Sequence, residues 1–480
     1  MSLMKNIVII GGGIAGLSAA YYASKQTGTT SRVTLLEQAD YWGGKLVTDR
    51  VPYGEGHFVI EGGPDTFVVT KPWGVKLCKE LGIFDRLRGT NPETKKTYIL
   101  KNEKLHELPG GLTMMIPTEF GPMVRTGLLS WPAKARMGLD FVLPAARANG
   151  DETLGAFVTR RLGRAAYENL IEPLMSGIYA GDGDQLSLQS TFPYLRDLEL
   201  EHGGLVKGAL ALRRERLRKA RVNGGSSSPA PGSRSLFLTP VTGLAEMVEA
   251  LLKNLERSSI ELRLRTAVQE ISRTRDGYSV MLSNGESLPA DGVILATPSY
   301  ITADLVDHFA PDLAAELRPI EYVSTATVTL AFRESELPQP LDGYGYVIPR
   351  REGRKALACT WTSTKFPHRA PEGYALLRVF IGRAGQEDEI PWDDAGLLEV
   401  AREELSLTLG ISTDPLLTRI YRWEKAMPQY NLGHPERLHR IERILSVHPG
   451  LALAGNAYQG IGIPDCIHSG EMAVQKIFSD

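Results

Sequence analysis

The segment that most constrains the fold of this chain is a glycine-rich turn that joins a strand-like run to an alanine-rich run. Residues 7–10 read IVII, which suits a strand buried on both faces of a parallel sheet, and residues 17–23 suit a tightly packed helix. The GGGIAG between them fits GxGxxG, whose glycines allow a tight turn, close approach of backbone to a pyrophosphate and close helix packing. We therefore expect a Rossmann-type dinucleotide-binding unit whose turn consists of Gly11, Gly12, Gly13, Ile14, Ala15 and Gly16.

A second strand that ends in an acidic residue strengthens this interpretation. Residues 32–37 read RVTLLE, and Glu37 stands 21 residues beyond Gly16, where a carboxylate accepts hydrogen bonds from ribose hydroxyls. The Gly43-Gly44-Lys45 that follows resembles the FAD-dependent flavoproteins of the two-dinucleotide-binding type. No second GxGxxG and no CxxC occur, so we expect the flavin to pass its electrons to oxygen or another small acceptor.

Composition and spacing exclude several other classes of protein. Lysine and arginine total 54 against 56 acidic residues, so no basic field favours nucleic acid. The three cysteines and nine histidines have no zinc-ligand spacing, and GxSxG and P-loop motifs are absent. Residues 6–24 carry no charge, but the glycines in their centre indicate strand, turn and helix instead of a transmembrane segment or signal peptide. We therefore expect a soluble, cytoplasmic protein.

The order of segments predicts an α/β (α+β) protein with several domains, because 480 residues exceed the size at which one core keeps growing. Buried-strand runs near both chain ends imply that one domain is assembled from both, and the last segment predicts a helix over 469–478. Between residues 207 and 221 a basic run indicates a solvated helix face, with contact to an acidic lipid surface or a partner as the alternative. The expected parts are a dinucleotide domain (1–85, 236–300 and 430–480), a substrate domain with a mixed or antiparallel sheet (86–114 and 301–429), a helical insertion (115–222) and a flexible linker (223–235).

Two longer motifs resemble those of the oxygen-dependent protoporphyrinogen oxidases, within the monoamine-oxidase-like FAD superfamily. They read EPLMSGIYAGD at residues 172–182 and AGNAYQGIGIPDCI at residues 454–467. The stretch from Cys359 to Gly373 is most similar to the soluble Gram-positive bacterial branch, which prefers coproporphyrinogen III to protoporphyrinogen IX. One departure is Thr242-Gly243, where the family usually has a glycine pair, and we expect it to alter the local turn and not the chemistry.

The resemblance implies noncovalent FAD, because no cysteine lies between Cys359 and Cys466, where a covalent linkage of the monoamine oxidase kind is expected. It also implies that two glycine-containing turns surround the flavin ring, that the Val268 backbone meets the adenine and that Trp423 closes the site. Val268, Ile461 and Trp423 equally suit ordinary core positions. The implied cofactor residues outside the first turn are Glu37, Gln38, Gly44, Lys45, Gly63, Pro64, Asp65, Thr66, Val268, Trp423, Asn456, Ile461, Gly462 and Ile463.

The implied reaction is the six-electron oxidation of a porphyrinogen to a porphyrin in haem biosynthesis, with oxygen reduced to hydrogen peroxide. Because the flavin carries the hydride transfer, no catalytic side chain and no metal are expected. A flat, apolar substrate with carboxylate arms calls for an apolar cleft with cations at its rim. The candidate substrate residues are Lys71 as a propionate partner, the backbone of Tyr179 and Gly181 facing the ring, and Tyr346 on the cleft wall.

Other functions use the same scaffold. A flavin amine oxidase or a carotenoid desaturase would share the FAD site, and Trp423 with Tyr430 would supply the paired aromatic residues of an amine oxidase. A non-enzymatic flavin- or porphyrin-binding protein is the alternative from another class. The sequence leaves open the choice between the two porphyrinogens and any transient contact with neighbouring haem-pathway enzymes.

Overall fold

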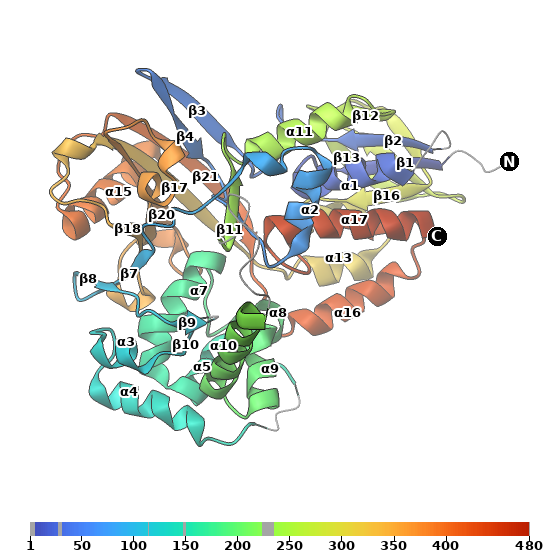
Figure 1. Ribbon diagram of the computed structural model, residues 1–480. Coiled ribbons are helices and arrows are strands. Elements are labelled where there is room, and N and C mark those ends of the chain that lie inside the picture. Colours follow the sequence, from blue (N-terminus) through green and yellow to red (C-terminus); the bar gives the residue numbers. More distant parts are fainter. Residues whose placement is uncertain (1–4, 27–30, 114, 147–149, 223–234, 480) are drawn as a thin grey trace.

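The glycine turn lies at the carboxyl end of β1 (Lys5–Ile10), the central strand of a five-stranded parallel sheet. The computed structural model describes residues 5–26, 31–113, 115–146, 150–222 and 235–479 (Figure 1). The strand order is β12-β2-β1-β16-β22, and every neighbouring pair is parallel. This confirms that one sheet is built from both ends of the chain. Its other strands are β2 (Ser31–Leu36), β12 (Ile260–Arg263), β16 (Gly292–Leu295) and β22 (Leu451–Leu453).

Both faces of this sheet are covered by other elements. Successive side chains of a strand point to opposite faces, so the residues of β1 enter two different cores. Ile7 and Ile9 are buried among one layer of helices, whereas Val8 and Ile10 are buried in a second cluster on the other face. The first layer contains α1 (Ile14–Gln26), α2 (Pro72–Glu80), α11 (Ala245–Leu255) and α17 (Ile463–Ser479). The second contains α12 (Ser299–Val306), α13 (Pro311–Leu317), α16 (His434–Leu445) and the small sheet β13 (Val268–Arg273), β14 (Tyr278–Leu282) and β15 (Ser287–Ala290).

Helix α17 begins at Ile463, six residues before the start that the sequence predicts. Pro464 lies in its first turn, where a missing N–H does no harm. Gly470 lies inside the helix, as predicted, and a Cβ there would stand 2.4 Å from the carbonyl oxygen of Ala15. This glycine therefore serves the close packing of α17 on α1.

A second sheet of seven strands forms the neighbouring region, at the upper left of Figure 1. Its order is β21-β17-β20-β19-β18-β7-β8, with β18 and β7 parallel and the other pairs antiparallel, so the predicted mixed sheet is confirmed. Helix α15 (Asp394–Leu409) packs on one face. The strands are β7 (Lys96–Lys101), β8 (Lys104–Glu107), β17 (Tyr322–Arg333), β18 (Gly343–Val347), β19 (Ala356–Trp361), β20 (Tyr374–Ile381) and β21 (Leu417–Pro428).

The third region is mainly helical and lies at the bottom of Figure 1. Its core is apolar, with Phe157, Leu162 and Met175 fully buried. It contains the short pair β9 (Leu112–Thr113) and β10 (Ile116–Pro117) and the helices α3 (Phe120–Arg125), α4 (Trp131–Gly138), α5 (Leu154–Leu162), α6 (Arg164–Ala166), α7 (Glu172–Tyr179), α8 (Leu188–Thr191), α9 (Pro193–His202) and α10 (Leu205–Val222).

Several segments lie elsewhere than the expected domain boundaries place them, and two of them are long. Residues 299–317, expected in the substrate domain from residue 301, form α12 and α13, which follow β16 directly and bury their apolar residues on the parallel sheet. The hairpin of β3 (Thr48–Tyr53) and β4 (Gly56–Glu61), expected in the dinucleotide domain, packs Phe58 and Ile60 against the seven-stranded sheet. The remaining strands are β5 (Phe67–Val68), β6 (Leu87–Gly89) and β11 (Phe237–Pro240), and α14 is Thr362–Lys365.

The predicted linker at 223–235 falls almost wholly outside the described residues. In the described part of the chain, no helix combines the length and the apolar character that crossing a bilayer requires.

Candidate functional site

The three glycines of the GxGxxG turn have different surroundings. Gly11 has φ +107°, and a Cβ there would stand 2.7 Å from the carbonyl oxygen of Ala296. A Cβ on Gly16 would stand 1.9 Å from the carbonyl oxygen of Gly11. A Cβ on Gly13, by contrast, would meet no atom of the described residues within 4 Å. The first and third glycines therefore hold the turn together, and Gly13 lines an open surface.

This surface suits a pyrophosphate. The backbone N–H groups of Gly13 and Ala15 donate to no acceptor among the described residues, as the first N–H groups of a helix do when they await an external partner, whereas Ile14 takes part in the bridge between Gly13 and Gly43. The helix dipole of the 13-residue α1 adds positive potential at the same point.

Glu37 lies directly beside the glycine turn. Its Oε2 accepts a hydrogen bond from the N–H of Gly12 at 2.6 Å, and its Oε1 accepts one from the N–H of Ala39 at 2.8 Å. The carbonyl of Glu37 accepts from the N–H of Thr266 at 2.8 Å, which brings Val268, the first residue of β13, close to the carboxyl end of β2. Gln38 is exposed on this edge.

The backbone of Gly13, Gly44, Lys45 and Gly63 forms a series of close contacts, here called the backbone track, which leads from the glycine turn toward the seven-stranded sheet. The N–H of Gly43 donates to the carbonyl of Gly12 at 2.9 Å, and a Cβ on Gly44 would stand 3.2 Å from the Cα of Gly13. A Cβ on Gly63 would stand 2.0 Å from the carbonyl oxygen of Lys45. The predicted residues of the first turn, of 44–45 and of 63–66 are thus brought together.

The side chain of Lys45 is enclosed within this track. Its Nζ donates to the carbonyl of Ala426 on β21, and burial lowers the pKa of the ammonium to about 8, while the thiol of Cys466 opposes the shift. Lys45 therefore ties the track to the second sheet.

The Gly62–Thr66 turn rests on buried charges that the sequence analysis did not identify. Arg378 of β20 binds Asp65 Oδ1 at 2.6 Å, and Arg369 binds Glu61 Oε1 at 3.0 Å. Burial alone would raise the pKa of the Asp65 carboxyl, but Arg378, Lys365 and Arg369 bring it down to about 2. Trp423 donates from Nε1 to the carbonyl of Gly62 at 2.8 Å, so this predicted residue also packs against the turn.

The loop that precedes α17 reaches the same place from the carboxyl end of the chain. Tyr430 donates from its hydroxyl to the carbonyl of Asn456 at 2.6 Å and accepts from the N–H of Gly460 at 2.9 Å. The N–H of Gly462 donates to Asp465 Oδ2 at 3.3 Å. Ile461 packs against the helical core and Ile463 is buried at the start of α17.

Lys71, the candidate propionate partner, joins this loop. Its Nζ lies 2.7 Å from both carboxylate oxygens of Asp465, whose side chain is buried. The lysine side chain itself is 43% exposed, so it lies at the surface and not in a core.

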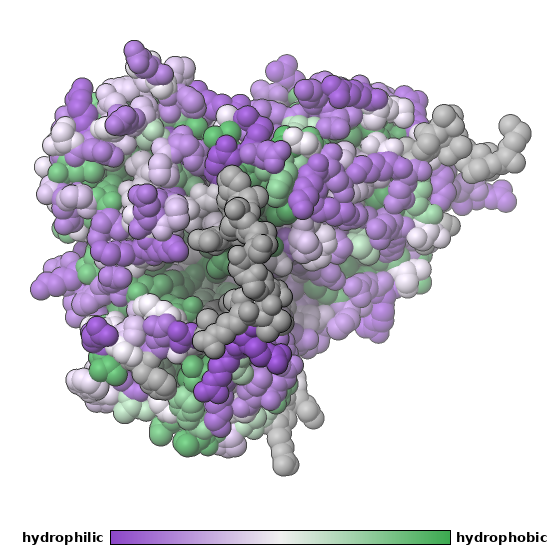
Figure 2. All heavy atoms as spheres, in the orientation of Figure 1, coloured by the Kyte–Doolittle hydropathy of each residue, from purple (hydrophilic) through white to green (hydrophobic). Residues whose placement is uncertain are grey.

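Tyr179 and Gly181 lie where α7 meets the second sheet. The carbonyl of Tyr179 accepts from Nε2 of Gln429 at 3.1 Å, and that of Gly181 accepts from Nη2 of Arg350 at 3.3 Å. Both carbonyls, which the sequence analysis placed against a substrate ring, therefore already have protein donors. Figure 2 shows apolar side chains gathered where the helical region meets the seven-stranded sheet region.

The structure does not bring Tyr346 to these residues. Its side chain is buried in the core of the seven-stranded sheet, and its hydroxyl donates to Glu404 Oε1 at 3.2 Å. Val347, one residue further along β18, packs instead against the helical region. The expected cleft-wall position is corrected accordingly, since a shift of one residue in a strand reverses the face.

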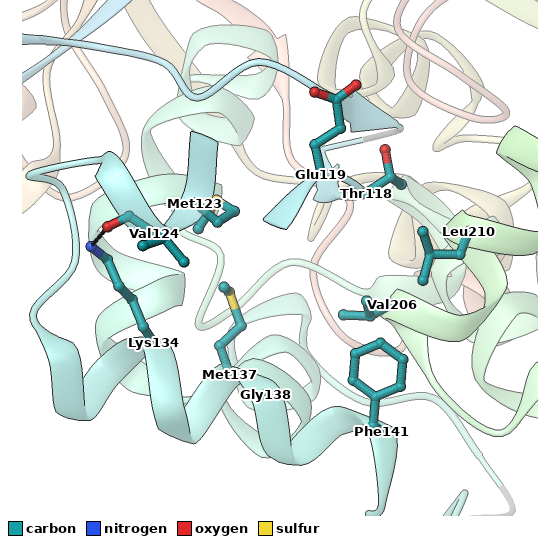
Figure 3. A pocket seen from close by; sticks show the side chains of 10 residues that line it. All are labelled: Thr118, Glu119, Met123, Val124, Lys134, Met137, Gly138, Phe141, Val206 and Leu210. Atoms are coloured by element: carbon teal, nitrogen blue, oxygen red, sulfur yellow. Dashed lines mark hydrogen bonds between the residues drawn. The ribbon is translucent and has the colours of Figure 1, made fainter. Parts of the chain in front are cut away.

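A cavity of about 110 Å³ lies apart from all these residues, within the helical region (Figure 3). It is lined mainly by apolar side chains such as Met123, Met137 and Phe141, and Lys134 donates to the carbonyl of Val124 at its edge. None of its lining residues was predicted to bind cofactor or substrate.

These features suit a dinucleotide, and the chain belongs to the flavin-containing amine oxidoreductase family, whose sequence profile matches residues 14–478. It is 38% identical to coproporphyrinogen III oxidase of Bacillus subtilis over 98% of this chain and 97% of the relative. It is 34% identical to the Staphylococcus aureus protein of the same name, with both chains fully covered. The crystal structure of a putative protoporphyrinogen oxidase from Exiguobacterium sp. 255-15 superposes with a TM-score of 0.83 at 34% identity, over 98% of each chain.

Proposed function

We propose that this protein binds FAD noncovalently and oxidises coproporphyrinogen III to coproporphyrin III, with oxygen as the electron acceptor. The observation that carries the proposal is its similarity along its whole length to proteins named coproporphyrinogen III oxidase. The backbone track from Gly13 to Gly63 supports an extended dinucleotide. The proposal includes a cytoplasmic location and transient contact with the enzymes that supply and consume the tetrapyrrole.

Bound FAD would supply the redox chemistry, taking a hydride from the bridge carbons of the substrate and giving electrons to oxygen to form hydrogen peroxide. The residues of this chain position the two molecules. The N–H groups of Gly13 and Ala15 would hold the pyrophosphate, and Glu37 would hold the ribose. The remaining predicted contacts follow the same track, through Gly44 and Lys45 to the turn at Gly63, Pro64, Asp65 and Thr66, with Val268, Trp423, Asn456, Ile461, Gly462 and Ile463 around it.

The direct test is aerobic turnover by the purified protein. We expect a yellow protein that releases FAD on denaturation, converts coproporphyrinogen III to a fluorescent porphyrin and releases hydrogen peroxide. Rates with protoporphyrinogen IX, measured in parallel, decide the substrate preference. A protein that carries FAD and oxidises polyamines but neither porphyrinogen would be an amine oxidase, and stoichiometric porphyrin binding without turnover would make it a binding protein.

Lys71 offers a prediction about the substrate carboxylates. We expect Lys71→Met to raise KM for coproporphyrinogen III about tenfold and to change kcat by less than about threefold, because a rim cation that holds a propionate equally in ground and transition states contributes uniform binding. The measurement is steady-state kinetics of FAD-loaded protein.

Asp465→Asn is the matched control, because it removes the same ion pair but keeps the lysine. If Lys71 binds a propionate, Asp465→Asn leaves KM unchanged or lowers it. Equal rises in KM for both variants would mean that Lys71 acts only as the partner of Asp465.

A further inference from the structure

The buried cluster beneath the Gly62–Thr66 turn contains three basic and two acidic side chains. Arg369, Arg378 and Lys365 face Glu61 and Asp65, and the two guanidinium groups are 0% and 2% exposed. Lys365 Nζ lies 4.0 Å from Asp65 Oδ2. No other carboxylate of the described residues pairs with these three cations. Arginine stays protonated in proteins, so two of the positive charges are permanent.

Arg378 directs its hydrogen bonds at this turn, and its guanidinium also lies over the ring of Phe380, 4.7 Å from the centroid. Besides Asp65, it donates to the carbonyl of Gly62 at 3.2 Å and to the carbonyl of Gly63. Arg378 is the one charged residue of β20, and its sequence neighbours Leu377 and Val379 are fully buried. Burying a charge costs free energy unless the charge is paired; Asp65 supplies the paired carboxylate, although Nε of Arg378 has no hydrogen-bond partner among the described residues.

The arginines that bind the carbonyl groups of this turn also determine the direction of the N–H groups in the same peptide units. A trans peptide is planar, so its N–H points away from its C=O. Because Arg378 holds the carbonyl of Gly62, the N–H of Gly63 points away from the cluster; because Arg369 holds the carbonyl of Asp65 at 2.9 Å, the N–H of Thr66 does the same. Neither N–H donates to an acceptor among the described residues. Two donors are therefore aligned and left for an external partner.

We infer that Arg378 is a positioning residue that aligns the N–H of Gly63 toward the flavin and, through its charge, favours the reduced state of the flavin. The inference rests on the proposed function, because it requires FAD beside this turn. Reduced flavin readily carries a negative charge that oxidised flavin lacks, and a cation in a region of low dielectric stabilises that charge. Asp65 opposes the effect, since its own carboxylate is negative.

Arg378 and Asp65 carry opposite charges, so their removal should shift the flavin equilibrium in opposite directions. Residues with a purely structural role would not produce such opposite shifts. FAD-loaded wild type, Arg378→Met, Asp65→Asn and Arg378→Lys are reduced anaerobically beside a reference dye, and the equilibrium between flavin and dye is measured by absorbance. We expect Arg378→Met to shift the equilibrium at least tenfold toward oxidised flavin, about 30 mV for a two-electron couple. Asp65→Asn is expected to shift it severalfold toward reduced flavin, and Arg378→Lys to stay within about threefold of wild type.

A matched control is Arg161→Met, which removes an equally buried arginine paired with Asp140 at 2.6 Å in the helical region and is expected to leave the equilibrium unchanged. Shifts of the same sign for Arg378→Met and Asp65→Asn, or no shift in either, overturn the inference. If Arg378→Met retains no FAD, the other two variants decide the question. The inference is then overturned if Asp65→Asn shows no shift toward reduced flavin or if Arg378→Lys departs from wild type by more than about threefold. Porphyrinogen turnover by wild type is measured separately, so that a failure of the proposed substrate leaves the dye equilibrium interpretable.

Discussion

A Gly13→Ala variant is expected to fold as the wild type does but to bind FAD at least a hundredfold more weakly. Apart from its chain neighbours, the added methyl group would meet no atom of the described residues within 4 Å, and the backbone of Gly13 is not in the left-handed region, so the fold tolerates it. The same methyl group would occupy the surface on which we place the pyrophosphate, where backbone must approach the phosphates closely. A hundredfold loss corresponds to about 2.8 kcal/mol of binding free energy.

The measurement is FAD titration of apo-protein, with thermal unfolding of the apo form as the check on folding. Gly138→Ala is the matched control, because its Cβ also meets nothing within 4 Å, its φ is −62°, and it lies in the helical region. We expect Gly138→Ala to change neither quantity. Unchanged FAD affinity in Gly13→Ala would place the dinucleotide elsewhere. Gly16→Ala should instead destabilise the apo-protein itself, since its Cβ would overlap the carbonyl oxygen of Gly11.

Replacing Arg369 with methionine is expected to lower the free energy of unfolding by about 3–5 kcal/mol at neutral pH, the usual consequence of removing one partner from a buried ion pair. Arg369 and Glu61 are both 0% exposed, and Arg369 also donates to Thr239 Oγ1 at 2.8 Å. Its loss leaves the Glu61 carboxylate buried without a cation at 3.0 Å. Urea unfolding of the apo-protein measures the change.

The pH dependence of this deficit has a definite sign. Burial already raises the pKa of Glu61 in the wild type, and Arg369 is the main group that opposes the rise. Without Arg369 the pKa of the folded state rises further above that of the unfolded state, so the variant is destabilised at pH values above the folded pKa and recovers as the pH falls below it. We therefore expect a smaller deficit at mildly acidic pH. The double variant Glu61→Gln/Arg369→Met should recover much of the loss at neutral pH, and a double variant as unstable as the single one would contradict this account.

The sequence was enough to predict the parallel sheet and the glycine turn beside Glu37, because both depend on local patterns. A β-branched run, three glycines and an acid at a fixed spacing define β1, the turn and β2 without reference to anything distant. The two arginines beneath the Gly62–Thr66 turn are different. Arg369 and Arg378 contact Asp65 across 304 and 313 residues of chain, and no local pattern reports such a contact. The one available signal was a charge inside the otherwise apolar run of residues 375–381.

Tyr346 and α17 illustrate two other limits of sequence interpretation. In β18 the alternation of side chains decides which face a residue occupies, and the tyrosine lies one position away from the residue that faces the helical region. In α17 the predicted start at residue 469 is six residues late, because Gly460 and Gly462 indicate a turn by their propensity while the helix already begins at Ile463. In both places tertiary packing, and not the local pattern, determines the outcome.

The parallel sheet contains strands that lie far apart in the sequence, so during synthesis its early strands and helices form before the later elements that pack against them exist. The edge of β16 stays unpaired until β22 emerges, and the face of α1 stays uncovered until α17 folds against it. Lys5 of β1 contacts Ile477 of α17 across 472 residues, a separation whose closure is slow compared with local folding. A nascent chain therefore carries the glycine turn long before it carries β22 and α17, which complete the sheet and the helix layer around that turn.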